Sequence, residues 1–477
     1  MLIVLSFLIP AVSAVHVFRM HDAEKRRSTV IWTLIASSVL AVLAGIFGEA
    51  LTFLPLSDTL YLRFGTDGLS LFFVTLVSFI WCLVQFHAFG YMKHEGKEEQ
   101  FFGFFLLTYA ALVALAFAQN AVTLYMCFEL MSLASMPLVL HNGTERSREA
   151  AFKYLGYSTL GACMALLGFF LLGAQGNDLS FTPGGAKLTG DPKVLLAAAF
   201  LIILGFGAKA GMVPLQMWLT EAHPVAPSPA SAVLSGLITK AGVLSILRCA
   251  FQLFGRGMLQ GTWVQTAVLT LSIVTIFTGS MLAQREKVLK KRLAYSSVSN
   301  VSYVIFGLFT FETFGVVGAF LQIVFHALAK DALFLCAGSV IFAAGCTKTD
   351  ELRGIGRRMP VTMWCFAIAS LSLIGIPPMG GFAAKYCLAR GALAGGSTLG
   401  LVGLVVLMLS ALLTAFYLLP IVAAAFFPGR DFEAGQPCEV PKTMLVPQLV
   451  FAGLTVLLGL FPNGLNAVFA ILNGLVL

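Results

Sequence analysis

Charged residues are scarce in this sequence of 477 residues. Only 11% are Asp, Glu, Lys or Arg, whereas 58% are hydrophobic and the mean hydropathy is +0.91. A soluble globular protein carries about a quarter charged residues. So few charges cannot cover a water-facing surface of this size, which excludes a soluble enzyme as the main interpretation. The composition indicates an integral membrane domain, because about 20 apolar residues suffice for one helix to cross a bilayer.

The sequence also lacks the motifs of the common metal and cofactor sites. Its nine cysteines form no CxxC pair, so the spacing of zinc or iron–sulfur ligands is missing. It contains no P-loop, no HExxH and no GxGxxG after a predicted strand. We therefore expect no metal site, no cofactor and no catalytic redox centre in this chain.

Apolar runs separated by polar residues predict about fourteen membrane-spanning helices, and thus an all-α polytopic membrane protein. The predicted spans are 2–18, 29–48, 69–91, 101–119, 121–140, 150–174, 193–219, 229–254, 262–283, 296–310, 313–345, 360–394, 399–427 and 443–471. The windows 313–345 and 360–394 are too long for one straight crossing. Each is expected to contain a break or a connector.

Lys and Arg are distributed unevenly among the predicted loops. Nineteen lie in loops that follow odd-numbered spans, and four follow even-numbered spans, namely Arg63, Lys187, Lys193 and Arg256. Positive residues are enriched on the cytoplasmic side of membrane proteins. The asymmetry predicts that the odd-numbered loops are cytoplasmic and that both termini lie outside. The net charge of +8 belongs to these loops and does not indicate a nucleic-acid partner.

A small set of ionisable residues lies inside the predicted spans. Its deep members are Glu129, Lys209, Lys240, Lys330, Asp331 and Lys385. A charge at the bilayer centre costs roughly 2.5–3.5 kcal/mol, so these side chains must face protein or water. Structural ion pairs are one interpretation. The excess of lysines over acids favours another, in which the groups exchange protons, because burial and nearby charges both act on a lysine's protonation.

Two predicted spans combine glycine, proline and one of these lysines. Span seven contains LGFGAKAGMVP (204–214) with Pro214, and span twelve contains IGIPPMGGFAAK (374–385) with Pro377 and Pro378. Proline interrupts a helix, and irregular backbone at membrane depth is tolerated only beside protein or a water-filled cavity. Paired interruptions of this kind indicate the ion site of an inverted-repeat transporter.

The two interrupted spans are five spans apart, which predicts two inverted five-helix repeats made of spans 4–8 and 9–13. The chain then divides into an N-terminal three-helix segment (1–100), repeat one (101–254), repeat two (262–427) and a C-terminal helix (443–477).

Two histidines lie close to the predicted lysine sites. His326 precedes Lys330 by four residues, which places both on one helix face. A hydrogen-bonded core histidine and a proton relay both fit this spacing. His223 lies in the proline-rich segment 221–229, which we expect to be a rigid connector between spans seven and eight.

Five segments resemble one family of membrane subunits. FGAKAGMVPLQMWLTEAHPVAPSPASAVLSGLITKAGVLSILR (206–248) resembles the most characteristic stretch of the antiporter-like subunits of the complex I superfamily. The other four fit the same family in the same order, and the resemblance covers about residues 65–425. They are CFELMSLASMPLV (127–139), LAYSSVSNVSYV (293–304), FHALAKDALFLCAG (325–338) and LIGIPPMGGFAAKY (373–386).

The resemblance implies roles for individual residues. Glu129 matches the glutamate that pairs with the lysine matched by Lys209, and Lys240 matches the central lysine. His326 and Lys330 match the polar residues that link two half-channels, and Lys385 matches the exit-side group. Gln322 stands where the family often has another histidine, which implies a relay that depends more on water at this point.

The resemblance also implies a function and a set of partners, with alternatives open. The expected function is proton translocation by one subunit of a respiratory or hydrogenase-type complex in a prokaryotic cytoplasmic membrane. Expected partners are other membrane subunits, including a second antiporter-like subunit, and hydrophilic iron–sulfur or hydrogenase subunits. An Mrp-type Na⁺/H⁺ antiporter without redox partners is an alternative, and transport of Na⁺ stays open. A subunit of a bicarbonate-uptake assembly and a structural subunit that no longer pumps are further alternatives, and the intact charge set argues against the last.

Overall fold

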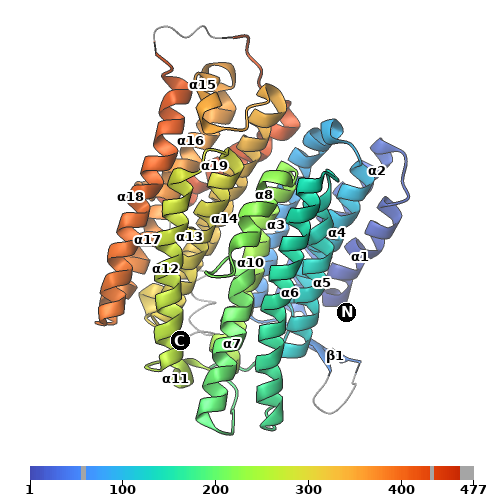
Figure 1. Cartoon of the computed structure of the whole chain (residues 1–477). Helices are drawn as coiled ribbons and strands as arrows, with labels where there is room; N and C mark the ends of the chain where they lie inside the picture. The colour runs from blue at the N-terminus through green and yellow to red at the C-terminus, as the bar shows by residue number, and fades with distance from the viewer. Residues whose placement is uncertain (55–60, 430–434, 462–477) are drawn as a thin grey trace.

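The structure is a bundle of helices that run side by side along one axis (Figure 1). The computed structural model describes residues 1–54, 61–429 and 435–461. The first half contains α1 (Leu2–Val17), α2 (Ala23–Phe47), α3 (Gly68–Glu95), α4 (Glu98–Ala116), α5 (Ala121–Leu140), α6 (Glu145–Ala174), α7 (Pro192–Ala210), α8 (Met217–Val225), α9 (Ser228–Val233), η1 (Leu234–Ile238), α10 (Thr239–Leu247) and η2 (Arg248–Leu253). The second half contains α11 (Arg256–Leu259), α12 (Trp263–Arg285), α13 (Leu289–Phe309), α14 (Thr313–Ala344), η3 (Thr349–Leu352), α15 (Ile355–Arg358), α16 (Pro360–Ile374), α17 (Gly380–Ala394), α18 (Thr398–Phe426) and α19 (Lys442–Leu460).

Within the described residues, 11 helical segments are long and apolar enough to cross a membrane. Two shorter apolar helices, α1 and α16, accompany them. The chain is therefore an integral membrane protein, whereas the count of fourteen crossings stays a prediction. The last predicted span, 443–471, is described only to residue 461, and the C-terminus lies outside the described residues.

Both predicted helix interruptions are present. α7 ends at Ala210, and Pro214 lies in the link 211–216 before α8 begins. α16 ends at Ile374, and Pro377 and Pro378 lie in the link 375–379 before α17. Gly211 and Gly375 follow the two helix ends with φ of 82° and 90°, a conformation that glycine adopts without strain. The backbone therefore leaves the helix beside a lysine in both places.

Two sequence-based predictions need correction, and the predicted connector 221–229 is mostly helical. His223 lies in the last turn of α8, which continues to Val225, and only two residues separate α8 from α9. α13 begins at Leu289 rather than at 296, so Lys290 is a buried helical residue and not a loop residue. A short two-stranded sheet, β1 (Leu51–Phe53) with β2 (Leu62–Phe64), adds to the otherwise all-α fold.

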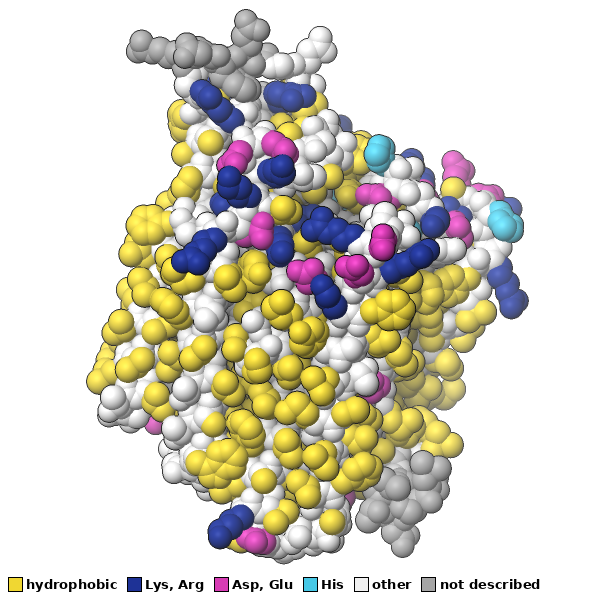
Figure 2. All heavy atoms as spheres, viewed as in Figure 1, with side chains coloured by type: hydrophobic (Ala, Val, Ile, Leu, Met, Phe, Trp, Pro, Cys, Tyr) yellow, Lys and Arg dark blue, Asp and Glu magenta, His cyan; other side chains and the backbone are white. Residues whose placement is uncertain are grey.

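Charged side chains gather at one end of the bundle, and hydrophobic side chains cover most of the face below them (Figure 2). α8 and α15 lie at this end (Figure 1), and ion pairs join side chains there, such as Lys153 with Glu221 and Lys287 with Asp350. Hydrophobic side chains such as Trp32, Phe152 and Val405 are more than half exposed on α2, α6 and α18. Such a surface suits lipid, or partner subunits within the membrane, better than water.

A buried ion pair joins η2 to the N-terminus of α3 near the end of the bundle that carries few charges. The Arg248 side chain is completely buried, and its Nη1 lies 2.9 Å from the Asp67 carboxylate at the N-terminus of α3. Its Nη2 also donates to the Ala116 carbonyl at the end of α4, at 2.8 Å. Burial alone would raise the pKa of the Asp67 carboxyl, but the Arg248 charge and hydrogen bonds from Arg248 and Gln252 hold that pKa well below its usual value.

Replacing Arg248 with alanine is expected to destabilise the protein by about 3–5 kcal/mol, because it leaves a largely buried carboxylate without its cation. The midpoint of thermal unfolding of the purified protein measures the effect. Lys187→Ala is the matched control, since Lys187 is exposed at the same end of the bundle. Equal midpoints for the two variants would contradict the structural role of the pair.

Candidate functional site

Lys209 is buried in the last turn of α7 and is surrounded by hydroxyl groups. Its ammonium donates to Ser132 Oγ at 2.9 Å, Tyr154 Oη at 2.6 Å and Ser158 Oγ at 3.0 Å. A lysine ammonium has three donors, so all three are used. The ammonium also lies 4.1 Å from the Tyr154 ring centre, where the π-face attracts a cation.

The expected ion pair between Glu129 and Lys209 is not formed in the part of the chain that the structure describes. The three hydroxyls take every N–H of Lys209, as described above. Glu129 Oε1 is buried without a hydrogen-bond partner among the described residues, and the side chain lines an apolar groove with residues of α1, α4 and α5. Ser132, which accepts a hydrogen bond from Lys209, lies one turn from Glu129 on α5. We refer to Glu129, Ser132 and Lys209 together as a short polar track.

Lys240 and His326 meet directly in the centre of the bundle. Lys240 Nζ lies 2.6 Å from His326 Nδ1 and donates to the Ser235 carbonyl at 2.7 Å. The exposed fraction is 1% for Lys240 and 2% for His326. The lysine comes from α10 and the histidine from α14. A proton shared by these two nitrogens can pass between the two predicted repeats without crossing an apolar barrier.

Lys330 lies one turn beyond His326 on α14 and contacts α13. Its ammonium donates to the Leu293 carbonyl at 2.8 Å and to Ser296 Oγ. Hydrogen bonds extend from this point along α13, where Asn300 Nδ2 donates to the Ser296 carbonyl at 2.8 Å. Gln322 Nε2 then donates to Asn300 Oδ1 at 3.0 Å. The side chain that replaces a histidine is therefore part of the hydrogen-bonded row.

Lys385 lies on α17, and its side chain reaches back to the break between α16 and α17. Its ammonium donates to the carbonyls of Leu373 and Ile374, both at 2.8 Å. These carbonyls lie at the C-terminal end of α16, where a helix leaves acceptors unpaired and carries partial negative charge. The ammonium also lies 5.4 Å from the Tyr303 ring centre. The interruption of span twelve thus provides the acceptors that this buried lysine needs.

His223 and Asp331 are the secondary candidates, and both are completely buried. The His223 ring stacks on Phe334 with 4.7 Å between ring centres, and neither ring nitrogen has a hydrogen-bond partner among the described residues. Neither carboxylate oxygen of Asp331 has a partner among those residues. Buried polar atoms without partners cost free energy. Their presence therefore indicates either internal water beside both side chains or a second arrangement of their neighbours.

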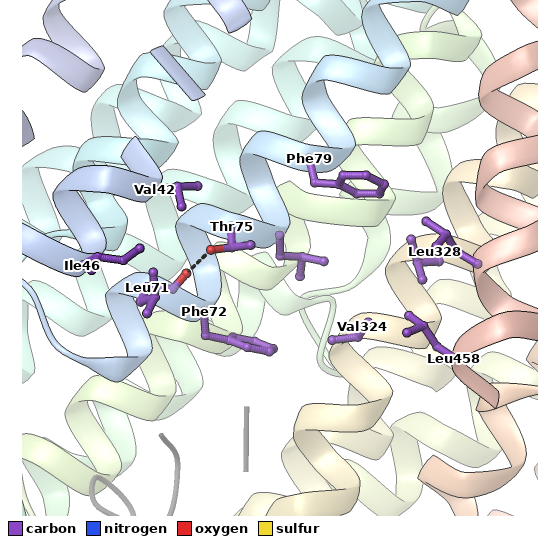
Figure 3. A pocket seen from close by; sticks show the side chains of 11 residues that line it. Val42, Ile46, Leu71, Phe72, Thr75, Phe79, Val324, Leu328 and Leu458 are labelled. Carbon is purple, nitrogen blue, oxygen red and sulfur yellow. Dashed lines mark hydrogen bonds between the residues drawn. The ribbon is translucent and has the colours of Figure 1, made fainter. Parts of the chain in front are cut away.

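The opposite face of α14 is apolar and lines a pocket (Figure 3). Val324 and Leu328 face this pocket, whereas His326 and Lys330 are each two residues further along the helix. Two residues turn a helix by about 200°, which separates the apolar and the ionisable faces. The one polar group in the lining, Thr75, donates its hydroxyl hydrogen to the Leu71 carbonyl at 2.7 Å. The pocket therefore lies on the side of α14 that faces away from His326 and Lys330.

Sequence reasoning found the lysines and missed their partners. Tyr154 and Ser158 are four residues apart on α6, and this polar stripe was a signal available in the sequence. Ser296 and Asn300 have the same spacing on α13. Serine and tyrosine are common in membrane helices, so only the contact with a lysine distinguishes these residues.

The ionisable row as a whole can bind and pass protons. This row consists of Lys209, Lys240, His326, Lys330 and Lys385, which all lie deep in the bundle. Each lysine has hydroxyl, imidazole or backbone carbonyl acceptors, and Lys240 and His326 contact each other directly. In the described residues no group of three or more His, Cys, Asp or Glu side chains could hold a metal ion.

Comparison with known proteins identifies the family. The family described as NADH:quinone oxidoreductase/Mrp antiporter, transmembrane, matches residues 118–414, and the N-terminal family of complex I chain 5 matches residues 54–102. NADH-quinone oxidoreductase subunit N of Desulforudis audaxviator is 34% identical over 81% of this chain and 80% of its own length. Hydrogenase-4 component B of Escherichia coli is 31% identical over 83% of this chain, which spans only 62% of that relative.

Two solved structures share the fold. A chain of the archaeal membrane-bound sulfane sulfur reductase has a TM-score of 0.87 and 19% identity, with 99% of this chain and 97% of that chain covered. A chain of the Mrp complex of Dietzia sp. has a TM-score of 0.83 and 20% identity, with 100% and 96% covered. At these identities the likeness concerns the fold.

Replacing Tyr154 with phenylalanine is expected to destabilise the protein by about 1.5–3 kcal/mol, the worth of a hydrogen bond to a charged group. The variant keeps the ring and removes one of three acceptors from Lys209. Tyr157→Phe is the control, because Tyr157 is half-buried on the same helix. Thermal unfolding midpoints compare the two, and an equal effect would mean that the Tyr154 hydroxyl does not hold the ammonium.

Proposed function

This chain belongs to the NADH:quinone oxidoreductase/Mrp antiporter family of membrane subunits, and on that premise we propose that it translocates protons as the antiporter-like subunit of a larger respiratory or hydrogenase-type complex. The observation that carries the proposal is the contact of 2.6 Å between Lys240 Nζ and His326 Nδ1 in a fully buried setting. Two basic nitrogens at this distance cannot both be cationic without strong repulsion. The contact therefore suits a site that holds one exchangeable proton.

In the proposed path, a proton enters near Glu129 and Lys209 and reaches Lys240. It passes from the Lys240 ammonium to His326 Nδ1, so that the lysine becomes neutral and the imidazole becomes cationic. Lys330 takes it onward beside the row from Ser296 to Gln322, and it leaves beside Lys385. Every step moves one proton between existing lone pairs.

The position of the Lys209 ammonium provides the control in this scheme. In the structure it is held by three hydroxyls, and in this scheme it leaves them to pair with Glu129. A unit charge acts on another at 4 Å by about 4 kcal/mol at an effective dielectric of about 20. α10 packs closely on α7 at this level, since a Cβ on Gly242 would lie 2.7 Å from the Ala210 amide nitrogen. Movement of Lys209 would therefore change the field at the next lysine.

The surrounding organisation follows the same proposal. The charged end of the bundle would face the cytoplasm of a prokaryotic cell, with the N-terminus outside. Spans 4–8 and 9–13 would form inverted repeats, each with one interrupted helix and one half-channel. Other membrane subunits, including a second antiporter-like subunit, would cover part of the apolar surface.

A subunit of an Mrp-type Na⁺/H⁺ antiporter is the second candidate. The fold likeness to the chain of the Dietzia Mrp complex, over 100% of this chain, supports it. The ionisable row is the same under both candidates. The difference lies in the partner subunits and in whether Na⁺ is transported.

Lys209→Ala and Glu129→Ala are each expected to abolish proton flux and to leave assembly of the complex intact. Both remove an end of the track that we propose as the entry. Flux is followed with a pH-sensitive dye in sealed vesicles that contain the complex, and assembly is checked by native gel. Lys153→Ala is the control, because Lys153 is half-exposed on α6 and pairs with Glu221 at 3.7 Å. Normal flux in either test variant would refute the scheme.

The native complex is expected to contain redox subunits. Purification in mild detergent, mass spectrometry of the subunits, and assays for iron, nickel and flavin test this directly. Metal-bearing subunits would identify the chain as part of an oxidoreductase. A metal-free group of small membrane proteins would favour the Mrp-type antiporter instead.

A further inference from the structure

The Asp331 carboxylate lies against the helix that carries Lys240. An ideal Cβ on Gly236 would lie 2.7 Å from Asp331 Cγ, so the carboxyl group occupies the space above this glycine. Gly236 belongs to the π-helical turn η1, directly before α10. Any side chain at residue 236 would collide with the carboxylate. Gly236 therefore leaves room for the Asp331 carboxylate, and we call this space the seat of the carboxylate.

The same seat lies within reach of the Lys240 side chain. Residues 236 and 240 are four apart, so they share a helix face. Helical side chains point back toward the N-terminus, and Lys240 Nζ indeed donates to the Ser235 carbonyl at 2.7 Å. The ammonium is thus drawn toward the residue that adjoins the seat. His326 and Asp331 both lie on α14, and both contact the helical segment that carries Gly236 and Lys240.

Asp331 is also the one acidic side chain on the two helical segments that meet here, 228–253 and α14. The segment 228–253 contains no Asp or Glu, and Asp331 is the single acid of α14. Lys240, Lys330 and His326 surround the region, while both Asp331 oxygens lack a hydrogen-bond partner among the described residues. A buried acid beside buried cations, yet not bonded to any of them, indicates a second position for one of the cations.

We propose that Asp331 is an alternating partner of Lys240. In the arrangement seen here the ammonium contacts His326 Nδ1, and in the other it leaves that nitrogen and donates to an Asp331 oxygen. No covalent bond changes, and the lone pair of His326 Nδ1, released by the ammonium, becomes free to bind a proton. Asp331 is a positioning residue in this scheme. The inference rests on the proposed function and adds a carboxylate to the centre of the proposed path.

Three variants test the proposal in the intact complex. Asp331→Asn keeps the shape and removes the charge, and Gly236→Ala keeps the acid and displaces it from its seat. Each is expected to lower proton flux by about tenfold, the change in rate that corresponds to about 1.4 kcal/mol. In the third, Gly236→Asp is combined with Asp331→Ala, which returns a carboxylate to the same space from the opposite helix. This pair is expected to restore flux, an effect that a packing role would not produce.

The outcomes separate this inference from the proposed function. Asp350→Asn is the control, because Asp350 is an exposed acid at the charged end. Normal flux in Asp331→Asn, together with no flux in Lys209→Ala, would overturn the inference alone. Loss of flux in the single variants without recovery in the relocated pair would reduce Asp331 to a packing residue. Failure of both Asp331→Asn and the relocated pair to assemble would make Asp331 a folding residue and would also overturn the inference.

Discussion

The need to give every buried ammonium a set of acceptors determines much of this structure. Lysines 209, 240, 330 and 385 are at most 8% exposed, and none of them forms an ion pair within the described part of the chain. An unsolvated charge in such surroundings would cost several kcal/mol. Neutral acceptors replace water instead, and they are hydroxyls, backbone carbonyls and, for Lys240, the His326 imidazole. Such acceptors stabilise the ammonium charge but hold it less firmly in one position than a carboxylate partner would.

The interrupted helices follow from the same requirement. A continuous helix uses its own carbonyls, and only its last turn has acceptors to spare. The break after Ile374 creates such a turn in the middle of the bundle, and Lys385 is placed to use it. Lys209 shows another solution, since it lies in the last turn of α7 but takes its acceptors from α5 and α6. The two sites are therefore similar in backbone and different in chemistry, which allows them to hold a proton with different affinity.

The sequence predicted the elements whose signal is local, and it missed those that depend on distant contacts. A lysine in an apolar run is visible in one dimension, and so are the interruptions at Pro214 and Pro377. The acceptors are not, because Tyr154 reaches Lys209 across 55 positions of the chain. The proline-rich segment after Glu221 was predicted to be a rigid connector, but its helical form was not predicted. Pro229 lies in the first turn of α9, where a missing N–H costs nothing. Lys290 looked like a loop residue because its helix begins with charged side chains.

The centre of the ionisable row differs from its two ends in the partners that surround its lysine. Lys209 and Lys385 have only neutral acceptors, whereas Lys240 lies between a histidine and the seat of a buried acid. A base and an acid on either side of one ammonium give that group two low-energy positions instead of one. A two-position group can be biased by a distant charge, because a small difference in field decides between states of similar free energy. The control exerted by partner subunits would then need no large movement of the helices around the lysines.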